Sequence, residues 1–515
     1  MIGRRLPAVL RHDHVFSRRI AIAEGRRYCV YGDLAGRAAR VAAALLDGRP
    51  DLEETRVALL APAGSPYVAG QWGTWIAGGV SVPLSPQQTL HEWAHILDDS
   101  RATDAIVAPE LAEALGPLAA ARRIRVTPAD NAAAAPSPEP FSWASIPAIG
   151  PERRALMLYT SGTTSRPKGV VLSHANLAAQ VECLTAAWEW RQDDRALHVL
   201  PLNHTHGAIN VLACALWNGA TCEFAQGFSP DDVWRRLASG EVTIFMAVPT
   251  IYSRLVAAWR EAQPDLRTRW SRGAAGLRLF VSGSAALPVS VLEAWREITG
   301  HTLLERYGMT EIGMALSNPL HGERRPGYVG TPLPGVEVRL VNEAGEDVSG
   351  REPGELLVRG PGVFLEYWGR PDATAEAFAE GGWFRTGDVA ARENGVFRIL
   401  GRLSVDIIKT GGEKVSALEI EAVLRDHPDI ADCAVVGLPD AEWGECVAAV
   451  VASRGPAALT LPGLREWARE RLSGPKLPRR LVTVSALPRN AMGKVVKPEL
   501  VRLFEGELEW TPRLQ

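Results

Sequence analysis

The chain has 515 residues, a length typical of a protein built from several packed units. Hydrophobic residues make up 46% and charged residues 22%, and the six cysteines are scattered without a CxxC pair, which argues against a disulfide framework or a zinc site. The formal net charge of −3 gives no overall basic field, so composition does not favour a nucleic-acid-binding protein.

The N-terminal residues 1–19 are rich in arginine, with Asp13 as their only acid, and faintly resemble a transit peptide. Patterning typical of a folded domain begins by about residue 28, which leaves little room for such a segment. We therefore expect a plain cytoplasmic start and a cytoplasmic protein. No apolar run is long enough to predict a membrane span.

Strands and helices alternate in the next part of the chain. The predicted strands cover residues 56–61, 79–84 and 105–108, and the predicted helices open at Tyr31, cover residues 66–77 and include Trp93. Residues 126–150 are rich in alanine, proline and serine and are predicted to be a surface connection. Strands that alternate with helices favour parallel sheets covered by helices.

The stretch 156–172 organises the rest of the chain. It begins as an apolar strand, continues into a loop of small hydroxylated residues and returns to an apolar run at 170–172. The loop residues are Thr160, Ser161, Gly162, Thr163, Thr164, Ser165, Arg166, Pro167 and Lys168. Ser173 is well placed to cap a following helix, whose apolar residues recur at helical spacing.

A loop of this composition suits phosphate. Glycine lets the backbone approach closely, consecutive N–H groups and hydroxyls point at anionic oxygens, and Lys168 adds a cation. The loop differs from a Walker A loop, because Pro167 precedes the lysine and Gly169 follows it. From these residues alone, an ordinary polar turn between two strands remains the alternative interpretation.

Two later segments join a strand to small or polar residues. Residues 198–201 are predicted to be a strand that leads into residues 202–207, where His204 and His206 beside a glycine suit a pocket wall. Residues 279–287 are predicted to be a strand that runs into a tight turn of small residues, where a flat ring can lie against the backbone. A plain βα turn, with a helix from Pro288, is the alternative interpretation of the second segment.

The segment 303–311 combines an apolar strand with charged residues. Arg306 lies two residues after Leu304 and two before Gly308, which predicts a buried surface where the cation must find a partner. Glu311 follows this strand and offers a carboxylate, which is a hard oxygen donor. Further along, Asp388 is a carboxylate acceptor suited to ribose hydroxyls, and a turn aspartate is the alternative interpretation.

In this order the segments resemble the adenylate-forming superfamily, which includes acyl-CoA synthetases, carrier-linked adenylation domains and luciferases. TSGTTSRPKG is similar to its phosphate loop and YGMTE to its YGxTE signature. The resemblance covers residues 28–500. Within the superfamily the runs VSGSAALP, ERYGMTE, VGTPLPG, SVDIIKTGG, KVSALEIE and PRNAMGK are most similar to malonyl-CoA synthetases.

The resemblance implies an ATP site with Mg²⁺ held by Glu311. Tyr307 is expected to stack on adenine, and Thr310 to hydrogen-bond the α-phosphate. The implied ATP-binding residues are Thr160, Ser161, Gly162, Thr163, Thr164, Ser165, Arg166, Pro167, Lys168, Gly283, Ser284, Ala285, Glu305, Tyr307, Gly308, Thr310, Asp388, Arg402 and Lys494. The implied catalytic residues are Lys494, Thr310, Glu311 and Lys168.

The resemblance also implies sites for an acid and for CoA. The implied substrate-binding residues are His206, Arg254, Ser282 and Arg306, and the implied CoA-binding residues are Gly411, Gly412 and Lys414. Arg254 and Arg306 are expected to bind the distal carboxylate of a diacid, because arginine offers donors matched to carboxylate geometry.

The expected fold is α/β. A large N-terminal adenylation domain of residues 1–401 would contain helix-covered, mostly parallel sheets and a β-rich subdomain. A small, mobile α+β C-terminal domain of residues 402–515 would act as a lid that rotates about the hinge at 402–406.

The implied activity is an ATP-dependent acid–thiol ligase that makes malonyl-CoA from malonate, ATP and CoA through malonyl-AMP, releasing AMP and pyrophosphate. Its partners would be small molecules, with no nucleic acid or membrane, and a carrier protein is not favoured because no carrier domain is fused to these residues. The alternatives are a ligase for another short carboxylate, a stand-alone adenylation enzyme that loads a carrier protein, and a nucleotide-binding protein that has lost catalysis.

Overall fold

The structure is a computed structural model that describes residues 16–129, 147–160, 167–411, 413–455, 459–489 and 495–506. Contacts divide the chain into two compact units. The first holds residues up to Val338 together with Val358–Phe384, and the second holds Arg339–Leu357 together with the residues from Arg385 onward. The predicted domain boundary between residues 401 and 402 stays a prediction. The contact division falls earlier, because Asp388 on one strand pairs with Arg402 on the next and joins both sides of that boundary.

The first unit contains a nine-stranded sheet in the order β15-β14-β13-β12-β11-β9-β10-β1-β2. Its six middle strands, from β13 to β1, are parallel, and the outer strands are antiparallel. The strands are β1 (Ile20–Glu24), β2 (Arg27–Val30), β9 (Arg195–His198), β10 (Thr221–Phe224), β11 (Ile244–Ala247), β12 (Leu279–Ser282), β13 (Leu304–Met309), β14 (Gly313–Ser317) and β15 (Thr331–Pro332). The strand expected to begin at His198 instead ends there, because β9 pairs with β10 and β11 through the preceding residues.

A seven-stranded sheet in the order β18-β8-β7-β4-β3-β5-β6 also belongs to the first unit. Its strands are β3 (Arg56–Leu60), β4 (Val80–Leu84), β5 (Asp104–Val107), β6 (Arg125–Pro128), β7 (Arg154–Thr160), β8 (Lys168–Ser173) and β18 (Glu366–Tyr367). The strands from β6 to β7 are parallel, whereas β8 returns antiparallel to β7. β7 and β8 are the two strands that the sequence predicts on either side of the predicted phosphate loop.

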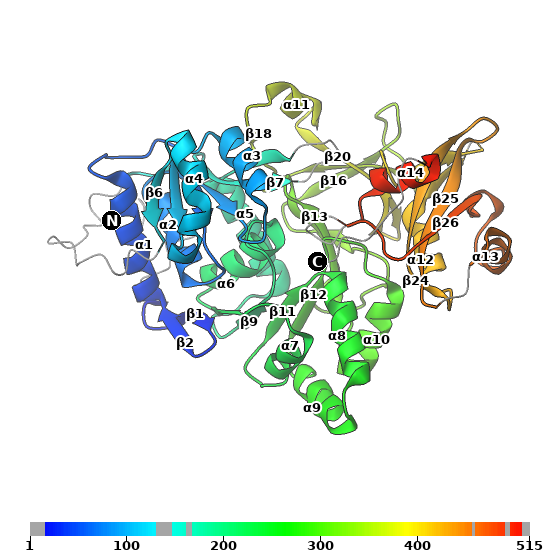
Figure 1. Cartoon of the computed structure of the whole chain (residues 1–515), viewed down its shortest axis with the longest axis horizontal. Helices are drawn as coiled ribbons and strands as arrows, with labels where there is room; N and C mark the ends of the chain where they lie inside the picture. Colours follow the sequence, from blue (N-terminus) through cyan, green and yellow to red (C-terminus); the bar gives the residue numbers. More distant parts are fainter. Residues whose placement is uncertain are drawn as a thin grey trace. The chain divides into compact units, whose positions relative to one another are not determined.

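Helices cover these two sheets (Figure 1). They are α1 (Tyr31–Leu46), α2 (Ser65–Ile76), α3 (Leu90–Ser100), the 3₁₀ turn Pro109–Leu111, α4 (Ala112–Arg122), α5 (His174–Trp188), the π-helix His206–Ala213, α6 (Cys214–Trp217), α7 (Pro230–Leu237), α8 (Pro249–Glu261), α9 (Pro264–Ala274), α10 (Val289–Thr299) and α11 (Pro371–Glu376). Ser173 caps α5 through a reciprocal capping box with Asn176, as its position predicts. The expected mixed α/β fold with parallel-rich sheets is confirmed.

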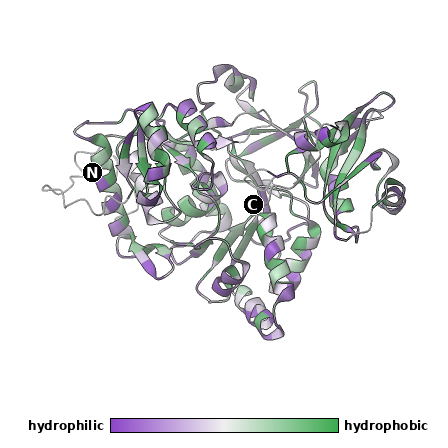
Figure 2. Cartoon of the chain, in the orientation of Figure 1, coloured by the Kyte–Doolittle hydropathy of each residue, from purple (hydrophilic) through white to green (hydrophobic). Residues whose placement is uncertain are grey.

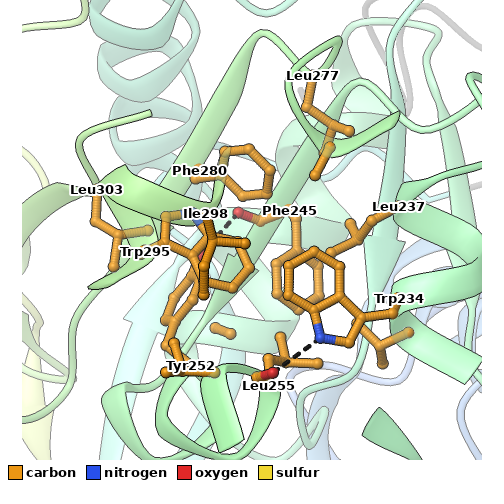
Figure 3. Packing of buried hydrophobic residues seen from close by; sticks show 14 of the residues in the cluster. Trp234, Leu237, Phe245, Tyr252, Leu255, Leu277, Phe280, Trp295, Ile298 and Leu303 are labelled. Atoms are coloured by element: carbon orange, nitrogen blue, oxygen red, sulfur yellow. Dashed lines mark hydrogen bonds between the residues drawn. The ribbon is translucent and has the colours of Figure 1, made fainter. Parts of the chain in front are cut away.

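An aromatic cluster forms a core under the helices that follow β10. Trp295 stacks at 5.2 Å on Trp234 and meets Tyr252 edge-on at 4.8 Å (Figure 3). The Tyr252 hydroxyl donates a hydrogen bond to the carbonyl of Val281 on β12 at 2.9 Å. Figure 2 shows α8, α9 and α10 with mixed hydrophobic and hydrophilic residues, as expected for helices with one buried face. The cluster therefore fixes α8 against β12 and the turn that follows it.

The remaining strands form two five-stranded sheets. One contains β16 (Glu337–Val341), β17 (Gly354–Arg359), β19 (Phe378–Ala379), β20 (Trp383–Glu393) and β21 (Val396–Arg402). The other contains β22 (Ile407–Thr410), β23 (Glu413–Ser416), β24 (Ile430–Asp440), β25 (Gly444–Ser453) and β26 (Arg480–Val484). The helices of this part are α12 (Ala417–Leu424), α13 (Leu461–Ala468), the 3₁₀ turn Gly474–Lys476 and α14 (Lys497–Glu505). Among the helices in the described ranges, none is long and apolar enough to cross a membrane.

Candidate active site

The β7–β8 hairpin holds the two ends of the predicted phosphate loop together. Thr160 pairs with Lys168 at the top of the ladder, so the loop begins and ends at adjacent positions. His95 on α3 contacts the carbonyl of Pro167 at 3.1 Å, and the Tyr159 hydroxyl donates to Asp99 at 2.8 Å. The predicted ATP-binding residues Ser161, Gly162, Thr163, Thr164, Ser165 and Arg166 lie outside the described residues.

Glu311, the predicted magnesium ligand, follows β13 and is only 5% exposed. One carboxylate oxygen, Oε1, accepts a hydrogen bond from the Tyr367 hydroxyl at 3.0 Å. A buried carboxylate is a hard oxygen donor, and a Mg²⁺ ion that is shared with phosphates needs one or two such groups rather than a full protein cage. The single buried carboxylate of Glu311 fits such a shared arrangement.

The small-residue turn after β12 approaches β13 closely. A Cβ atom at Gly283 would lie 2.6 Å from Cζ of Arg306, so a side chain there would displace the guanidinium. The next residue, Ser284, adopts a left-handed conformation with φ of 71°, which is strained for a residue with a side chain. Together with Ala285 it is exposed. The backbone of this turn therefore offers an open surface beside a buried guanidinium.

Arg306 is the buried cation that the sequence predicts. It is 4% exposed, its Nη2 lies 3.4 Å from the hydroxyl of Ser284, and within the described ranges its Nε has no hydrogen-bond partner. Burial lowers the pKa of the Arg306 guanidinium to about 9, because a charge removed from water is destabilised. An incompletely paired buried cation is expensive, which points to an anionic ligand at this position.

His206 adds a neutral polar group to the same cluster. It opens the π-helix, an irregular form that often occurs at functional sites, and its Nδ1 lies 3.3 Å from the Ser284 hydroxyl. Its Nε2 is buried without a partner among the described residues. Burial, with the nearby charge of Arg306, holds the pKa of His206 well below its usual range. The imidazole is therefore neutral at physiological pH.

The other two predicted substrate residues differ in their surroundings. Ser282, at the end of β12, is fully buried, and its hydroxyl has no partner within the described ranges. Arg254 on α8 is exposed, and its guanidinium lies over the Phe228 ring, 4.7 Å from the centroid. The structure thus brings Arg306, Ser284 and His206 together and places the Arg254 guanidinium against Phe228. The role of Arg254 in substrate binding stays a prediction.

The predicted adenine- and phosphate-binding residues lie along β13 and just after it. Because side chains alternate along a strand, Glu305 and Tyr307 share one face while Arg306 lies on the other. Glu305 is buried and accepts a hydrogen bond from the backbone N–H of Gly327 at 3.2 Å. Burial raises the pKa of the Glu305 carboxyl to about 8. Tyr307, Gly308 and Thr310 are partly exposed, as a ligand surface requires.

In the second unit the structure joins two of the predicted ATP-binding residues. Nε of Arg402 lies 3.0 Å from Oδ1 of Asp388, and Nη1 of Arg402 donates to the Thr386 carbonyl at 2.8 Å. Asp388 is 7% exposed. The pair therefore holds the carboxylate at a fixed position on β20, although its role toward ribose stays a prediction.

The predicted CoA-binding residues belong to the β22–β23 hairpin. Gly411 has φ of 58°, and a Cβ atom there would lie 2.7 Å from the Trp443 ring, so glycine is required. Lys414 forms an ion pair with Glu343 at 3.0 Å. Gly412 and the predicted catalytic Lys494 lie outside the described residues. Their functions stay predictions.

Sequence reasoning missed Tyr367. In the sequence it stands in a tyrosine–tryptophan pair after a β-rich stretch, a pattern that indicates ordinary core packing. The pairing of β18 with β8 brings its side chain to Glu311 and Lys168. No local signal in the sequence predicts that pairing.

Two family models match most of the chain. Residues 10–368 match the family described as AMP-binding enzyme, and residues 419–494 match the AMP-binding enzyme C-terminal domain. The chain belongs to the AMP-binding enzyme family, and the adenylate-forming class inferred from the motifs is confirmed. It is an AMP-forming acid–thiol ligase by class.

Individual relatives carry more specific descriptions than the family model. The chain is 47% identical to a mitochondrial malonate–CoA ligase of Mus musculus, over 88% of this chain and 82% of the relative. It is 40% identical to a malonate–CoA ligase of Arabidopsis thaliana, over 95% of this chain and 87% of the relative. The solved structure of ATP-bound MatB from Rhodopseudomonas palustris has a TM-score of 0.87 and 33% identity, covering 97% of this chain and 99% of that one.

Proposed function

We propose that this protein forms malonyl-CoA from malonate, ATP and CoA through a malonyl-AMP intermediate. The relatives described as malonate–CoA ligases support this reaction. So does a solved malonyl-CoA ligase complex with methylmalonyl-CoA and AMP, which is 37% identical with a TM-score of 0.66 over 92% of this chain and 97% of that one. The observation that carries the proposal in this chain is the buried, incompletely paired Arg306 beside Ser284 and His206.

The charge at Arg306 favours a diacid over a monoacid. A dianionic acid brings a second negative charge toward the α-phosphate, and a cation must offset the repulsion. Arginine matches carboxylate geometry with paired N–H donors. A monocarboxylate would leave the buried donors unpaired, and sites built around polar contacts reject such analogues by about 10⁴-fold. His206 is neutral, so it adds a hydrogen-bonding group without further charge.

The first chemical step needs no general base, because the malonate carboxylate is already a nucleophile. Its oxygen attacks the α-phosphorus, and the bond from that phosphorus to pyrophosphate breaks. The protein has to align two anions and neutralise their charge. Lys168 and Lys494 are the cations proposed for this task. In the second step the sulfur of CoA attacks the acyl carbon, AMP leaves, and the thiol proton passes to solvent.

We also propose that Mg²⁺ takes part, with Glu311 as its protein ligand. The ion would supply positive charge shared between the phosphates of ATP. The buried carboxylate of Glu311, held by Tyr367, supports this role. The cytoplasmic location likewise remains a proposal, supported by six cysteines that all have unpaired thiols. Fractionation of cells tests it, and recovery of the protein in an organelle would exclude it.

The test of function is an assay with ATP and CoA against a panel of malonate, methylmalonate, succinate, acetate and butyrate. AMP and thioester are measured together. We expect malonate to be the preferred substrate, methylmalonate to be accepted, and succinate, the longer diacid, to be a poor substrate. Equal use of acetate or butyrate would overturn the choice of acid and leave only the class of ligase.

A second arm separates the alternatives. Malonate-dependent exchange of pyrophosphate into ATP without any thioester from CoA would indicate an enzyme that loads a carrier protein. Absence of exchange with every acid would indicate a nucleotide-binding protein without catalysis. Exchange with thioester formation supports the proposal.

A further inference from the structure

Tyr367 connects two residues that the proposed reaction uses. Its hydroxyl donates a hydrogen bond to Oε1 of Glu311 at 3.0 Å. Nζ of Lys168 lies over the face of its ring, 5.0 Å from the centroid, which is within the range of a cation–π contact. One side chain therefore touches both the proposed magnesium ligand and the lysine that follows the phosphate loop.

The sheet explains this position. Tyr367 pairs with Val170 in the antiparallel β18–β8 ladder. Side chains two residues apart on a strand point to the same face, so Lys168 and Val170 share a face with Tyr367. Lys168 is then the diagonal neighbour of Tyr367, a separation that long and aromatic side chains span.

The segment before Tyr367 is fixed to the same part of the molecule. The backbone N–H of Phe364 donates to the Glu311 carbonyl at 2.7 Å, and the ring of Phe364 packs edge-on to Tyr367 at 4.8 Å. Asn176 on α5 donates to the carbonyls of Pro361 and Val363 at 2.8 and 2.9 Å. The segment that leads to Tyr367 is therefore held by Asn176 and by Glu311, and the Phe364 ring packs against the Tyr367 ring.

We propose that Tyr367 is a positioning residue for adenylation, which orients the carboxylate of Glu311 toward Mg²⁺ and the ammonium of Lys168 toward the phosphates of ATP. The inference rests on the proposed function. A carboxylate rotates about its last bond, and a hydrogen bond to one oxygen fixes the direction of the other. Groups that orient metal ligands in this way change metal affinity by about 10- to 100-fold when removed.

Three variants separate the two contacts. Tyr367→Phe removes the hydroxyl and keeps the ring, whereas Tyr367→Leu removes both. Tyr31→Phe is the matched control, because its hydroxyl donates to the Ala220 carbonyl at 2.7 Å in the buried core and has no proposed role. Thermal midpoints of all three report any general loss of folding.

The main readout is ATP binding by calorimetry without any acid, in MgCl₂ and in EDTA. We expect Mg²⁺ to raise the ATP affinity of Tyr367→Phe about tenfold less than it raises that of wild type. In EDTA the two proteins should bind ATP with the same affinity. Tyr367→Leu should also bind ATP more weakly in EDTA, because Lys168 is no longer held. The Mg²⁺ concentration for half-maximal pyrophosphate exchange should rise about tenfold in Tyr367→Phe, while thioester formation from supplied malonyl-AMP stays at the wild-type rate.

The outcomes are distinct. The inference is overturned if Mg²⁺ raises the ATP affinity of Tyr367→Phe as much as it raises that of wild type and of Tyr31→Phe. Equal weakening of Tyr367→Phe in MgCl₂ and in EDTA would also overturn it. The affinity ratio is independent of the amount of active protein, so partial unfolding does not imitate the effect. A wild-type protein that makes no malonyl-CoA contradicts the proposed function instead, and the ATP-binding comparison still decides the role of Tyr367.

Discussion

Nδ1 of His206 lies 3.3 Å from the hydroxyl of Ser284, although the two residues are 78 positions apart. The same hydroxyl lies 3.4 Å from Nη2 of Arg306. The π-helix, the turn after β12 and strand β13 thus converge on one polar cluster. Ser284 holds a left-handed backbone conformation there, and such strain concentrates at ligand sites.

Replacement of Arg306 by leucine should lower malonate turnover sharply. A hydrogen bond to a charged group contributes roughly 1.5–3 kcal/mol, so the loss in kcat/KM should be on the order of 10- to 100-fold. The gap between malonate and acetate should narrow, because the acetate complex no longer leaves buried donors unpaired. Steady-state kinetics with both acids measures this change.

Arg306→Lys is the control for that variant, since lysine keeps the charge without the paired donors. We expect an intermediate loss with the preference for malonate retained. An Arg306→Leu protein that still discriminates as well as wild type would show that the selectivity lies elsewhere, for example at Arg254.

Lys494→Ala should abolish formation of malonyl-AMP and spare thioester formation from supplied malonyl-AMP. The reason is that the lysine is expected to neutralise phosphate charge only in the first step. The two half-reactions are assayed separately by pyrophosphate exchange and by thioester release. Lys476→Ala, which removes an ion pair with Glu419 at 2.7 Å, is the control and should leave both steps intact. Equal loss of both steps in Lys494→Ala would contradict the division of roles.

Three buried histidines should make the fold sensitive to acid. Burial lowers the pKa of His174 to about 3 and that of His198 to about 4, and it holds the pKa of His206 well below its usual range. Each is neutral when folded and protonates when unfolded below about pH 6.5. Their contribution to the free energy of unfolding is therefore fully present above that pH and is lost as pH falls toward the folded pKa.

Urea denaturation between pH 5 and pH 8 measures this trend. Each histidine contributes a slope of up to about 1.4 kcal/mol per pH unit below pH 6.5. His198→Gln retains a donor for the Gly207 carbonyl, which His198 contacts at 3.0 Å. It should reduce the slope of unfolding free energy against pH by the contribution of one proton, about 1.4 kcal/mol per pH unit. A variant with the slope of wild type would show that His198 does not titrate between the two states.

Glu305 should produce the opposite trend. Burial raises the pKa of its carboxyl to about 8, whereas the unfolded value is near 4.5. Its contribution to the free energy of unfolding is thus fully present below about pH 4.5 and is lost as pH rises through about 8. Glu305→Gln removes the titration with little change of shape and should stabilise the ligand-free protein at pH 9 more than at pH 5. Equal differences at both pH values would exclude a neutral buried carboxyl.

The sequence by itself determined the features that depend on neighbouring residues. Helix α5 begins after Ser173 and buries the apolar residues that recur at helical spacing, because capping and periodicity act within a few positions. Strand β4 spans Val80–Leu84, within the strand expected over residues 79–84. The ordered motifs likewise led to the class of enzyme. All of these signals are read from contiguous residues.

The tertiary structure alone decided which distant residues meet. Arg306 is recognisable in sequence as a buried cation, but its neighbours Ser284 and His206 come from the turn after β12 and from the π-helix. Tyr367 reaches Glu311 across 56 positions because β18 adds to the edge of β8. Such pairings depend on strand register and on packing of the whole chain, and their free energy comes from burial shared among many residues. That shared burial cannot be predicted from a short segment of the sequence.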